Sequence, residues 1–142
     1  MSTLGSAFNA SASALSAERF RIETAVSNLA NAETTRGPDG QPYRRRDVVL
    51  ASDPVASFDK VLGSSTSTGV KVAAVVEDNE APRLRYEPGH PDANADGYVA
   101  LPNVDSAEEM VDMVSAARAY QANLTAISLI RDLVQRALDL GR

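Results

Sequence analysis

Long amphipathic stretches occupy both ends of this 142-residue chain and leave only its middle for other structure. Near the N-terminus, apolar side chains recur every seven residues, which is the spacing of a helix that packs along one side. The positions are Phe8, Leu15, Ile22 and Leu29. Arg19 places one charge in the same seam. The pattern predicts an N-terminal helix that begins near residues 3–6 and ends near residue 32.

The C-terminal stripe is longer and more apolar. Its positions follow the alternating three and four spacing of a coiled-coil seam, with Arg131 as the one member that is not apolar. The apolar members are Met110, Met113, Ala117, Tyr120, Leu124, Ile127, Val134 and Leu138. Asp105 or Ser106 precedes the stripe and can cap the first amides of a helix. Further apolar residues beside the seam widen the stripe, so we expect this helix to contact more than one neighbour.

These stripes predict an α+β protein that is mainly α. Residues 1–33 form an N-terminal coiled-coil helix, residues 34–104 a middle loop and small β region, and residues 105–142 a C-terminal coiled-coil helix. We expect the long N- and C-terminal helices to pair as a coiled coil and so to form one discontinuous domain. Because most of the remaining chain is rich in proline and turn-forming residues, we expect a small irregular middle and an elongated molecule.

The middle carries short patterns that are typical of strands. Residues 70–76 give the strongest strand pattern, and residues 47–51, 83–87 and 98–101 give weaker ones. Residues 70–76 and 83–87 are close in sequence, so we expect them to pair as a hairpin. A connection rich in serine and threonine is expected at 64–68.

Three consecutive arginines, Arg44, Arg45 and Arg46, precede the first strand pattern. A run this short in an acidic protein is typical of a solvated strand edge or of a salt-bridge strip between subunits. Arginines on an edge strand also discourage unwanted strand pairing. We therefore interpret the three arginines as surface residues rather than as an anion site.

A calcium-like spacing occurs at Asp92, Asn94, Asp96 and Gly97, which match the first positions of an EF-hand loop. The position that should supply a bidentate glutamate is Asn103, and prolines before the loop prevent an entering helix. The alternative is an Asx-type turn in which short side chains bind local amides and Gly97 adopts a positive φ. That turn requires no metal.

No group of residues in the sequence resembles a catalytic centre. His90 is the only histidine and the chain has no cysteine, so histidine-based triads, thiolate sites and cysteine nucleophiles are excluded. The carboxylate pairs lie at a solvated helix start and in a turn, without an apolar pocket to raise a pKa. We expect a protein that is not an enzyme and that holds no metal or cofactor.

Composition also limits the partners. The net charge of −5 and the sequence pI near 4.8 argue against a nucleic-acid partner, because phosphate-binding surfaces are usually basic. No segment approaches the roughly 20 apolar residues that span a bilayer, so we expect no membrane insertion. The N-terminus lacks both the basic start and the apolar run of a cleaved signal peptide.

A distinctive signature, Asn28-Leu-Ala-Asn31, lies near the end of the predicted N-terminal helix and is followed closely by Thr34. Further distinctive segments follow it in order at residues 42–49, 86–93, 97–104, 109–113 and 118–123. In this order the segments resemble the bacterial flagellar rod and hook proteins, and in particular subunits of the proximal rod, and the resemblance covers most of the chain.

The resemblance implies a structural subunit of the flagellar basal body, built into the rod that transmits motor torque. It implies terminal helices that pair and pack against other rod proteins, basal-body subunits and copies of the same chain. It also implies a location in the rod, which crosses the periplasm, and export by the flagellar export apparatus without a cleaved signal peptide. Asn28 and Asn31 join the seam residues as the expected assembly interface.

Two alternatives remain open at this stage. A free-standing coiled-coil oligomerisation adaptor would explain the helical stripes, although not the signature at 28–34. A calcium-regulated module would use Asp92, Asn94 and Asp96. For the rod interpretation, we expect terminal helices that stay mobile in the free subunit and become ordered when neighbours bury their stripes.

Overall fold

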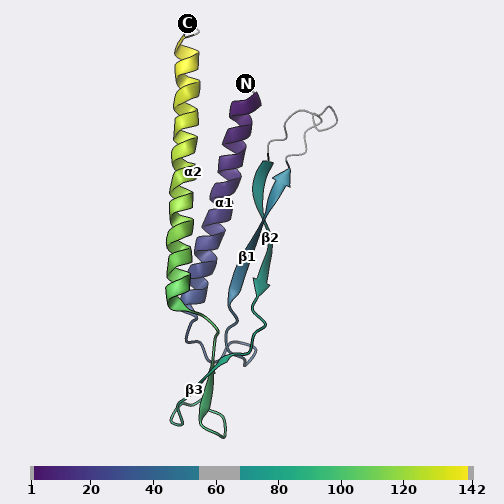
Figure 1. Ribbon diagram of the computed structural model, residues 1–142, viewed down its shortest axis with the longest axis vertical. Helices are drawn as coiled ribbons and strands as arrows, with labels where there is room; N and C mark the ends of the chain where they lie inside the picture. Colours follow the sequence, from purple (N-terminus) through teal and green to yellow (C-terminus); the bar gives the residue numbers. More distant parts are fainter. Residues whose placement is uncertain (1, 55–67, 141–142) are drawn as a thin grey trace.

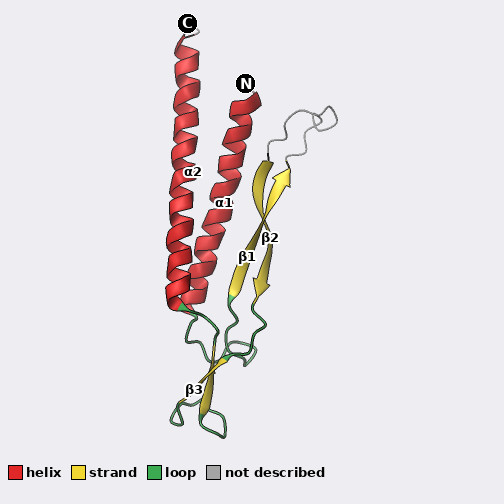
Figure 2. Cartoon of the chain, in the orientation of Figure 1, coloured by secondary structure: helices red, strands yellow, loops and turns green. Residues whose placement is uncertain are grey.

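The computed structural model describes residues 2–54 and 68–140 and consists of two long terminal helices with a small β-containing middle between them (Figure 1; Figure 2). This arrangement confirms the predicted mainly α fold class. Of the predicted connection at 64–68, residues 64–67 lie outside the described residues. The elements in chain order are α1 Ser2–Ala30, β1 Arg46–Pro54, β2 Thr68–Glu77, β3 Arg83–Tyr86, β4 Tyr98–Leu101 and α2 Ser106–Leu140.

The helix α1 lies between α2 and the hairpin formed by β1 and β2 (Figure 1). α1 and α2 run antiparallel, so the two termini lie at one end of the molecule, and the small sheet of β3 and β4 lies at the other end. The 35 residues of α2 extend about 52 Å at 1.5 Å per residue. The molecule is therefore elongated, as its long helical stripes predict.

The start of α2 is fixed by two sets of contacts. The Asp105 carboxylate accepts hydrogen bonds from the backbone N–H groups of Ala107 at 2.8 Å and Glu108 at 3.3 Å, so the predicted N-cap is confirmed. Just before the helix, the carbonyl oxygens of Pro102 and Val104 accept hydrogen bonds from the Arg83 guanidinium at 3.1 Å and 2.6 Å. These bonds fasten the small sheet to the entry of the helix.

The predicted pairing of residues 70–76 with 83–87 is wrong. β2 instead pairs antiparallel with β1, from Arg46 opposite Glu77 to Pro54 opposite Thr68, with a bulge between Val49 and Leu50. The nine residues of β1 offer the ten-residue β2 a longer backbone ladder than the four residues of β3 could. β3 pairs with β4 in a separate two-stranded sheet, and the predicted strand over 98–101 is confirmed.

The described core is small and is divided between the helix pair and the small sheet with the segment that leads from it to α2. Its buried apolar residues are Ala17, Ala25, Val99, Leu101, Val104 and Ala116. On the helices all of these are alanines, and small residues allow two helix backbones to approach closely. α1 also meets the hairpin, where the Ser13 hydroxyl accepts a hydrogen bond from the Val70 N–H at 3.0 Å.

The loop between β3 and β4 confirms the Asx-turn interpretation. The Asn94 side-chain oxygen accepts hydrogen bonds from the N–H groups of Asp96 at 3.0 Å and Tyr98 at 2.9 Å. Gly97 has a φ of 83°, as the turn requires. Asp92 contacts Thr35 and an arginine instead of joining this turn. His90 is half-buried, and its Nδ1 accepts a hydrogen bond from the Asp92 N–H at 3.1 Å.

Gly97→Ala should destabilise the small sheet. A Cβ at this position would lie 2.9 Å from a ring carbon of Tyr86, and the positive φ adds about 1–2 kcal/mol of backbone strain. We expect a loss of about 2 kcal/mol in unfolding free energy, measured by chemical denaturation. Gly89→Ala is the matched control, because nothing lies within 4 Å of its Cβ position. Equal stability of the two variants would contradict this account.

Candidate assembly interface

The side chain of Asn28 joins both helices to the first strand. Its Nδ2 donates to the Arg46 carbonyl oxygen at 2.8 Å and to Glu109 Oε2 at 3.0 Å. Its Oδ1 accepts from the Arg46 N–H at 3.0 Å and from the Tyr43 hydroxyl at 2.9 Å. An amide side chain offers two donor hydrogens and two acceptor sites, so Asn28 is fully satisfied. We call Asn28, Tyr43, Arg45 and Glu109 the polar junction.

Glu109 and Arg45 form the ionic part of the polar junction. Arg45 Nε donates to Glu109 Oε1 at 2.6 Å, and the Glu109 side chain is only 2% exposed. Partial burial lowers the pKa of Arg45, but the hydrogen bond to Glu109 and the nearby carboxylates outweigh it and raise that pKa above its usual value. Arg45 therefore stays charged. Each oxygen of the Glu109 carboxylate accepts a hydrogen bond, Oε1 from Arg45 and Oε2 from Asn28.

The polar junction corrects the interpretation of the three arginines as surface residues. The three arginines are not all surface residues: Arg45 turns inward, whereas Arg44 binds Asn79 and Arg46 pairs with Glu77 at the surface. Glu109, in the first turn of α2, is buried rather than solvated. Arg45 and Glu109 are far apart in the sequence and form no periodic pattern with each other. Their pairing is therefore visible only in the folded chain.

The other residues of the N-terminal signature form the turn that follows α1. Asn31 Nδ2 donates to the Ser27 carbonyl oxygen at 2.8 Å, and its Oδ1 accepts from the Thr34 hydroxyl at 3.2 Å. The next residue, Thr35, donates to Asp92 at 2.8 Å. The structure thus places Asn28 and Asn31 in contacts within the subunit rather than on an open surface.

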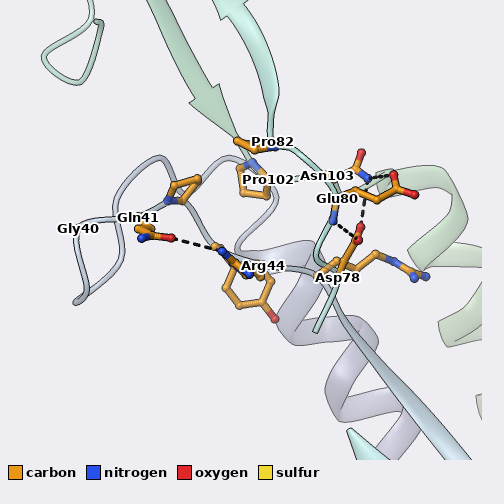
Figure 3. Close-up of a pocket in the computed structure, with 11 residues that line it drawn as sticks. Gly40, Gln41, Arg44, Asp78, Glu80, Pro82, Pro102 and Asn103 are labelled. Carbon is orange, nitrogen blue, oxygen red and sulfur yellow. Dashed lines mark hydrogen bonds between the residues drawn. The ribbon is translucent and has the colours of Figure 1, made fainter. Parts of the chain in front are cut away.

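A pocket of about 170 Å³ lies beside the junction, between the turn at 40–45 and the start of the chain leading to α2 (Figure 3). Asn103 Nδ2 donates to Asp78 and Glu80, each at 3.1 Å, and the Glu80 N–H donates to Asp78 at 2.8 Å. The backbone bond from Glu80, followed by the bond from Asn103, lowers the pKa of Asp78 below its usual value. These polar groups hold neighbouring segments of the same chain together.

The predicted seam residues divide into two groups. Half-buried members are Leu15, Ile22, Leu29, Met113, Tyr120 and Ile127. Exposed members are Phe8, Met110, Ala117, Leu124, Val134 and Leu138. The seam charge at Arg19 also faces solvent, where it pairs with Glu23 at 3.4 Å. The most buried helix positions are small or polar and lie outside the seam, so much of the seam stays uncovered in one subunit.

The uncovered apolar surface extends beyond the seam. On α2 it includes residues that widen the stripe: Val111, Val114, Leu129, Leu133 and Leu140. On the hairpin, Val49 and Val76 are exposed. The residue opposite Val76 lies two positions before Val49 on β1, so the two valine side chains are on the same face of the hairpin. Large exposed apolar surfaces on a folded chain are typical of interaction sites.

The charged residues in the later part of α2 are also left without partners. Beyond Asp112, within the described part of the helix, no side chain of this group takes part in an ion pair or a hydrogen bond: Arg118, Arg131, Asp132, Arg136 and Asp139. Most charged side chains elsewhere in the described residues have a partner. The outer surface of α2 thus combines free charges with exposed leucines. Neither helix is long and apolar enough to cross a membrane over the residues described.

Comparisons with known proteins point to one class. The family model "Flagella basal body rod protein" matches residues 8–38, and "Flagellar basal body rod FlgEFG protein C-terminal" matches residues 95–140. The flagellar basal-body rod protein FlgC of Salmonella typhimurium is 45% identical over 135 residues, covering 95% of this chain and 96% of its own. Proteins with the same description are 46% identical in Bacillus subtilis, covering 94% of this chain and 95% of their own, and 40% identical in Borreliella burgdorferi, covering 95% of each.

Glu109→Gln should weaken the junction that holds the two helices and the first strand together. The change leaves the Arg45 guanidinium without its carboxylate, and because that side chain is 21% exposed we expect a loss of about 2–3 kcal/mol, below the range for a wholly buried pair. Chemical denaturation measures the loss.

Glu108→Gln is the matched control for that change. The Glu108 side chain is 66% exposed and lies 4.0 Å from Arg45, so its replacement should change the unfolding free energy by less than about 0.5 kcal/mol. Similar losses in the two variants would show that the junction has no special role.

Proposed function

This chain belongs to the FlgC family of flagellar basal-body rod proteins and is a structural subunit of that rod, and we propose that it assembles there through the uncovered faces of its terminal helices. The supporting observation is the apolar surface that one subunit leaves exposed. Phe8 on α1 and Met110, Leu124, Val134 and Leu138 on α2 belong to the predicted seam and remain open to solvent.

Burial of these residues would supply the free energy of assembly. Removing apolar area from water contributes about 25 cal/mol per Å², so a stripe that hides of order 1,000 Å² gives a specific interface. The unpaired charges of α2 would then select which neighbours fit, since complementary charges suppress wrong partners. The neighbours are other rod proteins and copies of the same chain.

The polar junction has a separate part in this proposal. It fixes α1, α2 and the hairpin relative to one another, so each subunit would present its open faces in one arrangement. Heterologous contacts repeated between identical surfaces generate an open helical assembly. Torque would pass through many such contacts rather than through a single one.

The proposal also covers how the subunit is exported and where it acts. It is exported by the flagellar export apparatus, acts where the rod crosses the periplasm, and performs no catalysis. The far ends of the helices stay mobile until neighbours cover them, which would ease passage through a narrow export channel. Support for this step is that every residue from 131 to 140 is exposed in one subunit. No observation favours the free-standing adaptor.

Leu124→Asp should prevent incorporation into the rod and abolish swimming, while the purified chain keeps its helix content. Leu124 is exposed in one subunit, so a carboxylate there is tolerated until a neighbour buries it at a cost of several kcal/mol. Swimming in soft agar and immunoblots of isolated basal bodies measure the effect.

Gln121→Asp is the matched control, because it places the same charge at an exposed polar position one turn earlier on α2. It should leave incorporation nearly unchanged. Normal motility of the Leu124→Asp strain at wild-type protein level would remove this face from the assembly interface.

A further inference from the structure

The hairpin of β1 and β2 is a two-stranded sheet, so each of its strands has an outer edge. Along such an edge, alternate backbone N–H and C=O groups have no strand partner. An extended segment of another chain can bind these groups and add to the hairpin as a further strand. Whether the outer N–H groups are already occupied therefore decides how readily a strand can add.

The outer edge of β1 can be read from one contact. The Arg46 N–H binds the Asn28 side-chain oxygen at 3.0 Å, so it points away from β2. The extra residue of the bulge, Ala73, lies on β2, so the alternation along β1 is uninterrupted. The outward positions of β1 are Arg46, Val48, Leu50, Ser52 and Pro54.

Asp47 and Pro54 limit what this edge offers. Asp47 Oδ1 accepts a hydrogen bond from the N–H of the next residue, Val48, at 2.9 Å. Proline has no N–H group, so the last outward position of β1 has no donor. Between them only the N–H groups of Leu50 and Ser52 are left, and they offer an added strand a very short ladder.

The helix α1 lies alongside the hairpin and occupies one position on the outer edge of β2 (Figure 1). Val70 lies opposite Ser52, so its N–H also points outward, and it donates to the Ser13 hydroxyl at 3.0 Å. That hydroxyl donates in turn to the Ala10 carbonyl oxygen at 2.9 Å. Gly69 is buried, and a Cβ there would lie 2.9 Å from Ser13 Oγ, so the glycine lets helix and strand approach closely.

We infer that Asp47 and Ser13 block strand addition at the outer edges of the hairpin. Each occupies an outward N–H group that an extended segment of another chain would otherwise bind. The exposed faces of the helices are then left as the surfaces through which subunits associate. The inference goes beyond the proposed rod function, because it concerns a contact that the free subunit avoids and does not depend on what the helices bind.

Hydrogen exchange of the purified full-length chain shows whether the Val48 amide has been released. Asp47→Ala removes the acceptor, so this amide should exchange about tenfold faster. Asp47→Asn is the matched control, because it loses the charge but keeps a side-chain oxygen that can accept the bond. The Arg46 amide, which Asn28 binds, should stay protected in both variants and so report that the hairpin remains folded.

A fluorescein-labelled peptide with the sequence of residues 68–77 then probes strand addition by fluorescence anisotropy. It copies β2, the strand that pairs with β1 in the fold. We expect it to bind the Asp47→Ala chain at least about tenfold more tightly than the natural chain or Asp47→Asn. Adding Ser52→Pro to Asp47→Ala should abolish this binding, because the change removes an outward N–H group and spares the ladder between β1 and β2.

Ser13→Ala tests the edge of β2 in the same way. It should speed exchange at the Val70 amide and raise binding of the peptide. Ser16→Ala is its matched control, because the Ser16 side chain is exposed and its hydroxyl donates to the Ala12 carbonyl oxygen within α1 at 3.4 Å. The control should change neither measurement.

Several results would overturn the inference. Unchanged exchange at Val48 in Asp47→Ala would show that the carboxylate does not hold that amide. Faster exchange without peptide binding would show that the released edge takes up no strand, and equally tight binding to the natural chain would show that its edge is open. Binding that survives Ser52→Pro would show that the peptide displaces β2. None of these results bears on incorporation into the rod, which Leu124→Asp tests separately.

Discussion

The hydrogen bonds of Asn28 are the constraint on which the rest of the structure depends. One amide side chain binds the backbone of the first strand, the tyrosine before it and the buried carboxylate of α2. Because Glu109 also holds Arg45, removal of any one partner leaves a buried polar group unsatisfied, which costs more than a hydrogen bond contributes. This junction aligns two helices whose buried apolar residues are all alanines.

A small core and large open surfaces are consequences of the same design. Few residues are buried in one subunit, whereas large apolar side chains on both helices and on both small sheets stay exposed. A free-standing domain of this length would normally bury more of its apolar side chains. A rod subunit can leave them open, because its neighbours complete the burial. The polar junction would therefore set the geometry of the subunit, and assembly would supply most of the hydrophobic stabilisation.

The sequence was a good guide where periodicity or local turn chemistry decides the structure. It predicted both terminal helices, the Asp105 cap, the strand over 98–101 and the turn around Gly97, because each depends on neighbouring residues. It failed where the structure depends on contacts between residues that are far apart in the sequence. The partner of β2 is a strand that precedes it by a long connection, and the inward turn of Arg45 depends on a carboxylate that lies on the last helix. The resemblance to rod proteins identified the 28–34 signature without explaining it.

Residue-resolved hydrogen exchange of the free subunit and of the assembled rod tests the central claim most directly. The account predicts slow exchange at the amides of Arg46 and Glu109 in both states, because the polar junction is complete in one subunit. The amides of residues 131–140 should exchange rapidly in the free subunit and become protected only in the rod. Uniform protection of both helices in the free subunit, or rapid exchange at the junction, would contradict it.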